Sequence, residues 1–242
     1  MKKVIENFDR AAEQYESQAK PQAALAATLA EWVLPEEKIG RALELGAGTG
    51  LFTRRMLPWA GVYTATDAAQ KMVALGRAHC PTAKWQVLDA RIPSGLDPID
   101  WLFACSLLQW LPEPQTVLQH WRKILQPGGR MVLAVLLPGT LGELHSLLPE
   151  VKPLDWHTAT EWRSMVKHAG LTIEREQTWE QCSVHANSLE LLRAVHAMGL
   201  APHRSVGAGR LRAALQRYNQ RHVTPGGVQA TWRAWLVRAR AR

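Results

Sequence analysis

The 242-residue sequence has little cysteine and no long apolar run, and each scarcity excludes a class of protein. Only Cys80, Cys105 and Cys182 occur, and their spacing fits neither a zinc site nor a disulfide framework. Proline, glycine or charge interrupts every apolar run before the roughly 18 residues that a membrane span needs. The polar start, with Glu6 and Asp9, does not resemble a signal peptide. We therefore expect free thiols, no metal site and a cytoplasmic location.

Acidic residues are missing from the C-terminal end. From Leu191 to Arg242 there are ten arginines, no lysine and no acid, whereas the preceding residues carry 19 basic and 21 acidic side chains. The formal net charge of +8 therefore arises in the last 52 residues. A field of one sign predicts an acidic partner, which could be nucleic acid, anionic lipid or an acidic protein. The alternative is arginine on an ordinary solvated surface.

Short apolar segments alternate with segments of helical periodicity along most of the chain. This alternation is typical of an α/β fold with a mainly parallel sheet and helices on both faces. Residues 4–33 have near-helical spacing interrupted at Pro21, which predicts one or two helices at the start. The predicted strands are 41–45, 62–66, 85–88, 101–105, 130–136, 171–176 and 231–239, and the other predicted helices are 51–59, 69–79, 114–125, 160–169, 188–199 and 210–218.

A glycine-rich turn, Glu44 to Gly50, follows the first of these strands and opens a helix. Its small residues let a ligand approach the backbone and the free N–H groups of a helix N-terminus. Leu51 stands where a dinucleotide fingerprint has its third glycine, and no Lys-Ser or Lys-Thr follows as in a P-loop. A Gly-x-Gly-x-Gly turn preceded by Glu44 suits a ligand with a cationic amino group. S-adenosylmethionine is such a ligand.

Acidic residues also follow the next two strands. Asp67 is placed to accept hydrogen bonds from both hydroxyls of a ribose. Asp89, beside Ala90, is placed to accept a hydrogen bond from the amino group of adenine. Singly, each acid could be a helix cap or a solvated loop residue. Three acids after three successive strands favour a ligand site. The predicted cofactor-binding residues are Glu44, Gly46, Gly48, Gly50, Asp67, Asp89, Ala90 and Ser106.

On the pattern Glu44 to Gly50, residues 5 to 175 resemble the class I S-adenosylmethionine-dependent methyltransferases. The resemblance implies a Rossmann-like, seven-stranded, mainly parallel sheet whose last strand is antiparallel, with the cofactor across the strand ends. About 50 residues between the last two predicted strands are too many for a turn, which predicts an insertion. We expect one domain, with a helical lid over 1–35, a cofactor-binding core over 36–177, a helical insertion for substrate or partner over 178–230, and a last strand over 231–242.

Several further segments carry a more selective pattern: Phe8 to Ala12 with Tyr15, Ala19 and Gln22; Cys105 to Trp110; Leu137 to His145; Leu192 with Arg193; and Met198 to Ala201. They resemble the malonyl-acyl-carrier-protein O-methyltransferases of biotin synthesis. The resemblance implies methylation of the free carboxylate of a malonyl thioester, with acidic acyl carrier protein as partner. Two positions depart from the pattern, because His196 replaces a usual lysine and Thr231-Trp232 replaces Thr-Tyr.

The reaction implied by this resemblance places modest demands on the site. A carboxylate with a pKa near 4 is already a nucleophile at neutral pH, so no general base is required. What remains is to align its oxygen with the sulfonium methyl group and to exclude water. A cation must hold the second carboxylate oxygen, and Arg193 is the candidate because guanidinium fixes carboxylate geometry. The alternative for Arg193 is a surface position on a helix.

The other catalytic candidates are Tyr15, Gln109, Trp110 and His145. Tyr15 resembles the tyrosine that closes over the cofactor in this family, and Gln109 and Trp110 follow the strand that faces the methyl group. His145 is placed to meet the substrate. Packing or solvated roles remain the alternatives for these residues.

Three other functions stay open from the sequence alone. The protein could methylate another small carboxylate, methylate RNA through its basic end, or bind the cofactor without turnover. RNA methylation is less favoured, because no Asn-Pro-Pro-Tyr type sequence follows the fourth strand, and a non-catalytic role is less favoured because the cofactor loop is intact. A membrane partner is not expected.

Overall fold

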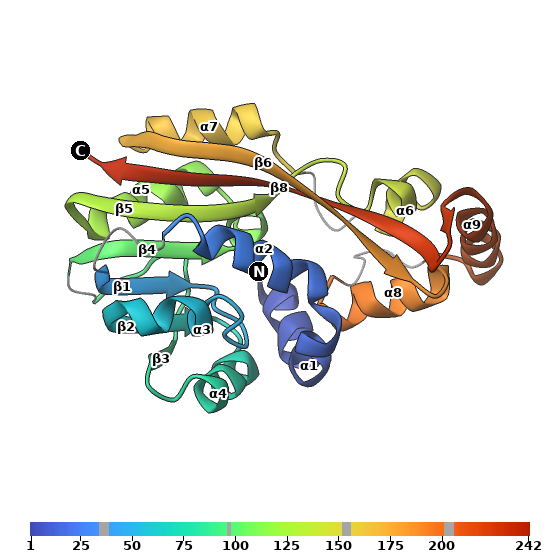
Figure 1. The fold of residues 1–242 in the computed structure, drawn as a ribbon, viewed down its shortest axis with the longest axis horizontal. Helices are drawn as coiled ribbons and strands as arrows, with labels where there is room; N and C mark the ends of the chain where they lie inside the picture. The colour runs from blue at the N-terminus through green and yellow to red at the C-terminus, as the bar shows by residue number, and fades with distance from the viewer. Residues whose placement is uncertain (34–38, 96–97, 152–155, 201–205) are drawn as a thin grey trace.

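Seven strands run side by side through the protein in the order β3-β2-β1-β4-β5-β8-β6 (Figure 1). The computed structural model describes residues 1–33, 39–95, 98–151, 156–200 and 206–242, and within these a short β7 pairs with β8. The first five strands pair in parallel, whereas β8 is antiparallel to β5 and β6. The predicted fold class is therefore confirmed. The strands are β1 Ile39–Leu45, β2 Ala60–Asp67, β3 Lys84–Val87, β4 Ile99–Cys105, β5 Leu125–Leu136, β6 Leu171–His185, β7 Val223–Thr224 and β8 Gly227–Ala241.

Proline decides where two of the helices begin or end. The expected break near residue 21 occurs at Ala19, and Pro21 lies in the first turn of the following helix, where its missing N–H costs nothing. The helix expected over 51–59 is shorter, because Pro58 leaves only a 3-10 turn over Leu57–Trp59. The α-helices are α1 Lys2–Gln18, α2 Lys20–Ala30, α3 Thr53–Met56, α4 Gln70–His79, α5 Pro114–Ile124, α6 Gly142–Leu147, α7 Ala159–His168, α8 Ser188–Ala197 and α9 Ala208–Arg221.

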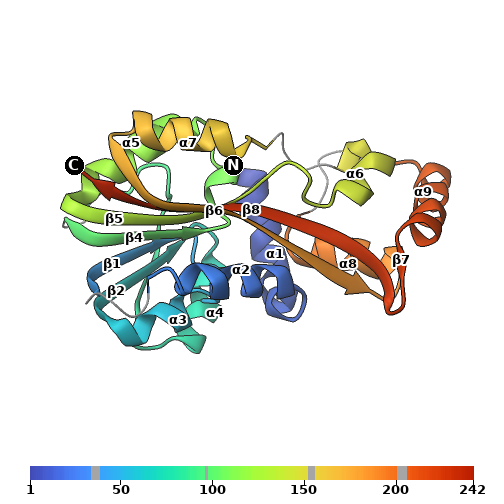
Figure 2. The same ribbon diagram turned by 45° about the horizontal axis from the view of Figure 1, so that its top comes forward.

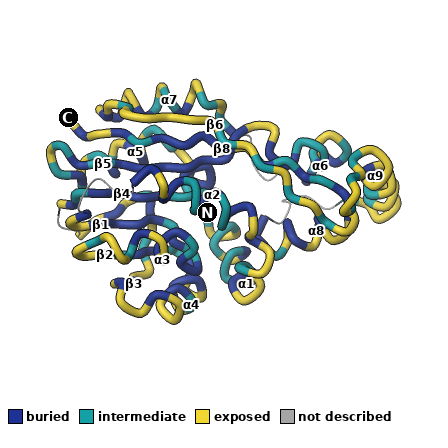
Figure 3. Tube along the Cα trace, viewed as in Figure 1, coloured by how far each residue is buried: buried dark blue, intermediate teal, exposed yellow. Residues whose placement is uncertain are grey.

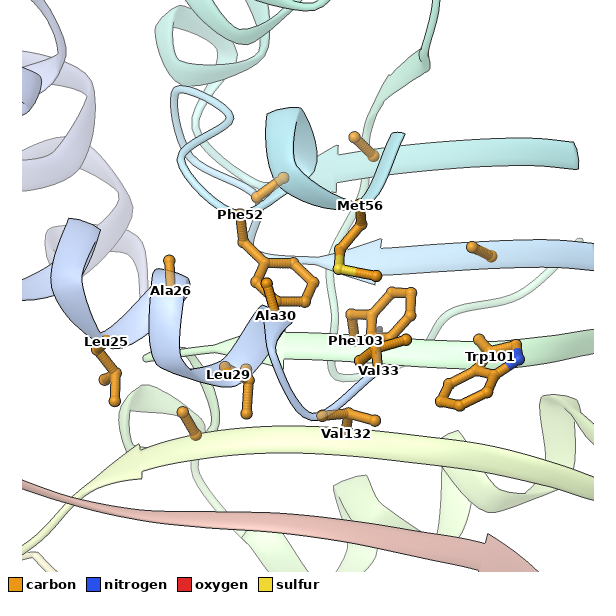
Figure 4. Packing of buried hydrophobic residues seen from close by; sticks show 14 of the residues in the cluster. Leu25, Ala26, Leu29, Ala30, Val33, Phe52, Met56, Trp101, Phe103 and Val132 are labelled. Carbon is orange, nitrogen blue, oxygen red and sulfur yellow. The ribbon is translucent and has the colours of Figure 1, made fainter. Parts of the chain in front are cut away.

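Helices cover both faces of the sheet, as Figure 2 shows. Successive strand residues alternate between two apolar layers: Phe103 packs with α2 and α3 on one face, and Leu102 with α5 and α7 on the other. Figure 4 shows the first layer, in which the Phe103 ring lies 5.3 Å from that of Phe52. This double coverage explains why the central strands read as nearly continuous apolar runs. Among the described helices, none has the length and apolar character needed to cross a bilayer.

The last two long strands are longer than their sequence pattern indicates. β6 continues to His185 and β8 begins at Gly227, so the expected boundaries at residues 177 and 231 fall inside strands. The outer part of β6 is largely exposed (Figure 3), so it lacks the apolar signal by which strands are recognised. Both strands run beyond the sheet as a two-stranded arm that carries α6, α8 and α9 (Figure 1). We call this outer part of the molecule the C-terminal lobe.

Candidate cofactor and substrate site

A cavity lies at the carboxyl ends of β1, β2 and β4, beneath helix α1. Crossovers in an open parallel sheet leave a crevice at this edge, which is where such folds bind ligands. Apolar side chains of α1 cover the cavity, and polar groups come from the loops that follow the strands. Its lining includes Val4, Ile5, Phe8, Tyr15, Gln22, Gly46, Gly48, Asp67, Met72, Asp89, Ala90, Cys105, Ser106, Gln109, Trp110, Leu136, Met198 and Leu200.

The glycine turn contributes two of its three glycines to the cavity. Gly46 and Gly48 line it with φ values of +67° and +56°, a region that other residues rarely adopt. A Cβ atom at Gly46 would lie 2.8 Å from the Leu107 side chain, whereas Gly48 faces open space. Gly50 does not line the cavity and packs instead near Cys80 and Trp85. The predicted binding role is therefore supported by position for the first two glycines only.

Glu44 lies behind the glycine turn, with 2% of its surface exposed. Its Oε2 accepts hydrogen bonds from Thr53 Oγ1 at 2.6 Å and from the Tyr63 hydroxyl at 2.8 Å. Burial raises the pKa of this carboxyl to about 7 despite those bonds. Glu44 lines a small recess beside the main cavity, together with Tyr15 and Gln22. It is positioned for a cationic group entering that recess, because a positive charge would favour its ionised form.

Asp67 ends β2 and presents its carboxylate to the cavity. Its Oδ2 accepts from the Gly48 backbone N–H at 2.9 Å and its Oδ1 from that of Ala69 at 2.8 Å. Burial nevertheless raises the pKa of Asp67. These bonds fix the carboxylate while leaving further lone pairs for the two hydroxyls of a ribose.

Asp89 also lines the cavity, although it already has a cationic partner. The guanidinium of Arg91 donates to both of its oxygens, at 2.6 Å from Nη2 to Oδ2, and lowers the pKa of the carboxyl. Ala90 is buried beside it, with its carbonyl accepting from the Trp121 indole at 2.6 Å. A nucleobase amino group at Asp89 would share the carboxylate with Arg91.

Helix α1 places Tyr15 over the cavity, next to aromatic residues that exclude water. Burial raises the pKa of Tyr15, so its hydroxyl stays protonated and able to donate. The Phe8 ring lies edge-on to Trp110, with centroids 5.7 Å apart, and contacts Tyr15 at 6.4 Å. Sequence reasoning gave Phe8 no role, although it belongs to the segment that resembles the subfamily. Thr53 and Tyr63, which orient Glu44, had no recognisable sequence signal.

The segment after β4 supplies the remaining polar groups. Ser106 has a φ of +60°, a strained conformation for a residue other than glycine, and it turns the chain at the cavity wall. Gln109 Nε2 donates to the Ser106 carbonyl at 3.0 Å, while its buried Oε1 has no partner within the described chain. Tyr15, Ser106, Gln109 and Trp110 all line the cavity, as their predicted roles require.

Two predicted catalytic residues do not lie among the residues that line the cavity. The Arg193 side chain is 66% exposed and pairs with Glu190 at 2.6 Å, one turn earlier on α8. It borders a separate surface groove between α1 and α8 with Arg10. His145 lies on α6 with its ring 6.0 Å from that of Trp156. α8 packs through Leu191, Ala194 and Val195, a face that leaves Arg193 in solvent.

The fold and the cavity define a class I S-adenosylmethionine-dependent methyltransferase. Residues 43–133 match the family described as "Methyltransferase domain". The chain belongs to the class I methyltransferases, and S-adenosylmethionine is the cofactor of this class. The cavity fits that molecule, because Asp67 presents acceptors for a diol and two buried carboxyls with raised pKa values would be stabilised in ionised form by its positive charges.

Curated relatives of the chain include malonyl-carrier and trans-aconitate methyltransferases. The chain is 29% identical to malonyl-[acyl-carrier protein] O-methyltransferase of Alcanivorax borkumensis, covering 98% of this chain and 85% of that one. It is 28% identical to the biotin biosynthesis bifunctional protein BioHC of Cellvibrio japonicus, of which it spans about half the length (49%). It is 30% identical to trans-aconitate 2-methyltransferase of Rhizobium leguminosarum bv. trifolii, covering 78% of this chain and 80% of the relative.

Solved structures share the fold at low identity. The YcgJ protein from Bacillus subtilis superposes with a TM-score of 0.68 at 15% identity, covering 90% of this chain and 98% of that one. The N-methyltransferase NodS from Bradyrhizobium japonicum, solved with S-adenosyl-L-homocysteine, has a TM-score of 0.58 at 13% identity, covering 97% and 98%. These similarities establish the fold and give no information about the substrate.

Proposed function

We propose that the protein methylates the free carboxylate of a malonyl thioester carried on acyl carrier protein, as a step of biotin synthesis. The observation that carries the proposal is the alignment of 98% of this chain with a malonyl-[acyl-carrier protein] O-methyltransferase. Further relatives of that name, from Paenibacillus and Brevibacillus, are 28% and 26% identical. The proposed site is the cavity under α1.

The cavity suits a reaction that needs positioning more than acid or base chemistry. When bound, S-adenosylmethionine supplies an electrophilic methyl group. Asp67 orients the ribose, and the recess at Glu44 receives the amino group. Phe8 and Trp110 exclude water from the methyl group, which strengthens its attraction for a carboxylate. The protonated Tyr15 hydroxyl donates to the carboxylate oxygen that does not react. We assign no catalytic step to Arg193 or His145, because neither borders this cavity.

The acidic carrier protein would approach the C-terminal lobe. Arg212, Arg217 and Arg221 are exposed on α9, while Arg210 on the same helix pairs with Glu150 at 2.5 Å. Further arginines of the basic C-terminal sequence lie on β8, which leads away from α9 and ends at the opposite end of the molecule (Figure 1). Arg233 and Arg238 of this strand pair with Glu180 and Glu174. The basic C-terminal sequence is thus divided in space, and α9 carries the part that suits an acidic protein.

The proposal is tested by mass spectrometry of malonyl carrier protein incubated with the enzyme and S-adenosylmethionine. We expect the acyl group to gain the mass of one methylene unit. The Asp67→Ala variant serves as a control for cofactor dependence. No gain in mass with wild-type enzyme would refute the proposed substrate.

A free small acid is the second candidate substrate, favoured by the 30% identity to a trans-aconitate methyltransferase. The two candidates differ in whether a carrier is needed. Parallel assays with trans-aconitate and malonyl carrier protein separate them, since efficient turnover of the free acid alone would favour the second candidate.

A further inference from the structure

Helix α1 covers the cofactor cavity, yet it has few buried apolar contacts with the helix beside it. Phe8 and Tyr15 of α1 line the cavity, and α1 lies next to α4 (Figure 1). The apolar cluster between these two helices has Ala12, Ala69 and Met72 as its buried members, whereas the clusters on the two faces of the sheet are much larger. Polar contacts should therefore account for a larger share of what holds α1 in place.

One polar contact joins α1 to the start of α4. Asp9 Oδ1 accepts a hydrogen bond from the backbone N–H of Lys71 at 2.9 Å. Lys71 lies in the first turn of α4, where N–H groups have no partner within the helix, and the residue at the N-cap, Ala69, has no side-chain acceptor. Asp9 supplies the acceptor that a capping residue would provide, and its negative charge is favourable at a helix N-terminus. A residue of α1 thus caps a helix of the cofactor-binding core.

A second polar contact joins the other end of α1 to the glycine turn. Glu16 Oε1 accepts a hydrogen bond from Arg54 Nη2 at 2.5 Å, and His79 Nδ1 lies 3.2 Å from the same oxygen. Arg54 Nε also donates to the Gly50 carbonyl at 3.2 Å. His79 Nδ1 lies 3.0 Å from the Thr49 carbonyl. The two cationic side chains are therefore shared between Glu16 of α1 and the backbone of the glycine turn.

The spacing along α1 places these contacts and the cavity-lining residues on adjacent sides of one helix. Asp9 and Glu16 are seven residues apart, which is about two turns, so both carboxylates lie on one side with Ala12 between them. Phe8 and Tyr15, each one residue earlier, have the same spacing and lie on the side that faces the cavity. Fixing the first side to α4 and the glycine turn therefore sets how the second side meets the cofactor.

We infer that Asp9 and Glu16 are positioning residues that hold α1 over the bound cofactor, and that Glu16 couples α1 to the glycine turn through Arg54 and His79. Neither carboxylate lines the cavity, so both act through Phe8 and Tyr15. Because the turn and α1 share these contacts, cofactor binding at the turn and attachment of α1 should favour one another. The inference concerns the cofactor, so it does not depend on which carboxylate receives the methyl group.

The first experiment measures how fast S-adenosylhomocysteine leaves the protein, by stopped-flow tryptophan fluorescence. Glu16→Gln removes the charge that holds Arg54, so we expect release about three- to fivefold faster, with an unchanged association rate. The factor is modest, because the side chains of Arg54 and Glu16 are 41% and 31% exposed. Glu13→Gln, at an exposed carboxylate of the same helix, is the matched control and should release at the wild-type rate. Release at the wild-type rate from Glu16→Gln, or equally fast release from both variants, would overturn the inference.

The second experiment separates the hydrogen bond of Asp9 from its charge. Burial and, as a smaller cause, the negative charge of Asp9 raise the pKa of Asp67, so loss of that charge could itself change cofactor binding. Asp9→Asn removes the charge and keeps an acceptor, since asparagine caps helices as well as aspartate does. We expect release to be about three- to fivefold faster from Asp9→Ala and unchanged from Asp9→Asn. Equal rates for these two variants would overturn the assignment of Asp9.

Hydrogen exchange distinguishes the loss of this attachment from a general loss of stability. In protein saturated with S-adenosylhomocysteine, the backbone amides of α1 should exchange about three- to fivefold faster in Glu16→Gln than in wild type, because α1 detaches more often. The amides of β4 and β5 should exchange at wild-type rates. Faster exchange in these strands as well, or wild-type exchange in α1, would overturn the inference.

Discussion

Charged side chains are buried at the carboxyl edge of the sheet but exposed on the C-terminal lobe. At the sheet edge, Glu44 and Asp67 are buried and oriented by hydrogen bonds, so they act on a ligand at contact distance. On α9, Arg212, Arg217 and Arg221 are exposed, so they act over a range set by salt. The first arrangement suits a small cationic cofactor and the second a large acidic partner. One region should therefore govern cofactor affinity, and the other the rate of encounter.

Removal of the Asp67 carboxylate should give the largest effect. Asp67→Ala loses both ribose acceptors and frees the Gly48 N–H, so we expect S-adenosylmethionine to bind about 10- to 100-fold more weakly. Isothermal titration calorimetry measures the change. Glu31→Ala, which removes an exposed carboxylate at the end of α2 and outside the cavity lining, is the control and should bind as wild type does. Unchanged affinity in Asp67→Ala would show that the cofactor lies elsewhere.

Glu44 should make the stability of the ligand-free protein depend on pH. Burial raises the pKa of Glu44 to about 7 in the folded protein, whereas a glutamate in the unfolded chain has a pKa of 4.5. Between these two pH values the folded state therefore holds a proton that the unfolded state has lost. The free energy of unfolding should therefore fall as pH rises through this window, by on the order of 2 to 3 kcal/mol. Urea unfolding of wild type and Glu44→Gln measures it.

The Glu44→Gln curve should lack this contribution. Cofactor binding should also tighten as pH rises toward 7, because the ionised carboxylate attracts the amino group. Parallel pH curves for the two proteins would contradict the burial that we assign to this carboxyl.

Charge reversal on α9 should lower kcat/KM for malonyl carrier protein about tenfold at low salt and leave kcat/KM for a small malonyl thioester without the carrier unchanged. The variant is Arg212→Glu with Arg217→Glu, and the matched control is Arg240→Glu with Arg242→Glu. The control reverses two arginines of the same basic sequence at the opposite end of the molecule. Wild-type activity with carrier protein should fall with added salt. Equal losses in both variants would show that total charge matters and the lobe does not.

Arg193→Ala should give the smallest effect. Arg193 does not border the cavity, so turnover of a small malonyl thioester should change less than about threefold. Loss of its exposed pair with Glu190 should lower the free energy of unfolding by at most about 1 kcal/mol. Steady-state kinetics decide the point. A loss of kcat by orders of magnitude would restore the role that the sequence predicted for Arg193.

Local signals account for what the sequence predicted well. The glycine turn, Asp67 and Asp89 each follow a strand of the parallel part of the sheet, and the parallel topology brings them to one edge. Arg193 and His145 were predicted to meet the substrate, but neither lines the cavity. Their positions depend on how α6 and α8 pack in the C-terminal lobe, which the local sequence does not encode. The long β6 was missed since its outer half is exposed and lacks an apolar pattern. The role of Phe8 could not be predicted, because it depends on how α1 packs over the cavity.

The central claim is that the cavity under α1 transfers a methyl group to the terminal carboxylate of a malonyl thioester. Its most direct test uses S-adenosylmethionine with a deuterated methyl group and malonyl carrier protein, followed by tandem mass spectrometry of the released acyl arm. The account predicts the label on the terminal carboxylate as a methyl ester in wild type, and none in Asp67→Ala. Label on another atom of the arm or on the carrier polypeptide, or no label in wild type, would contradict it.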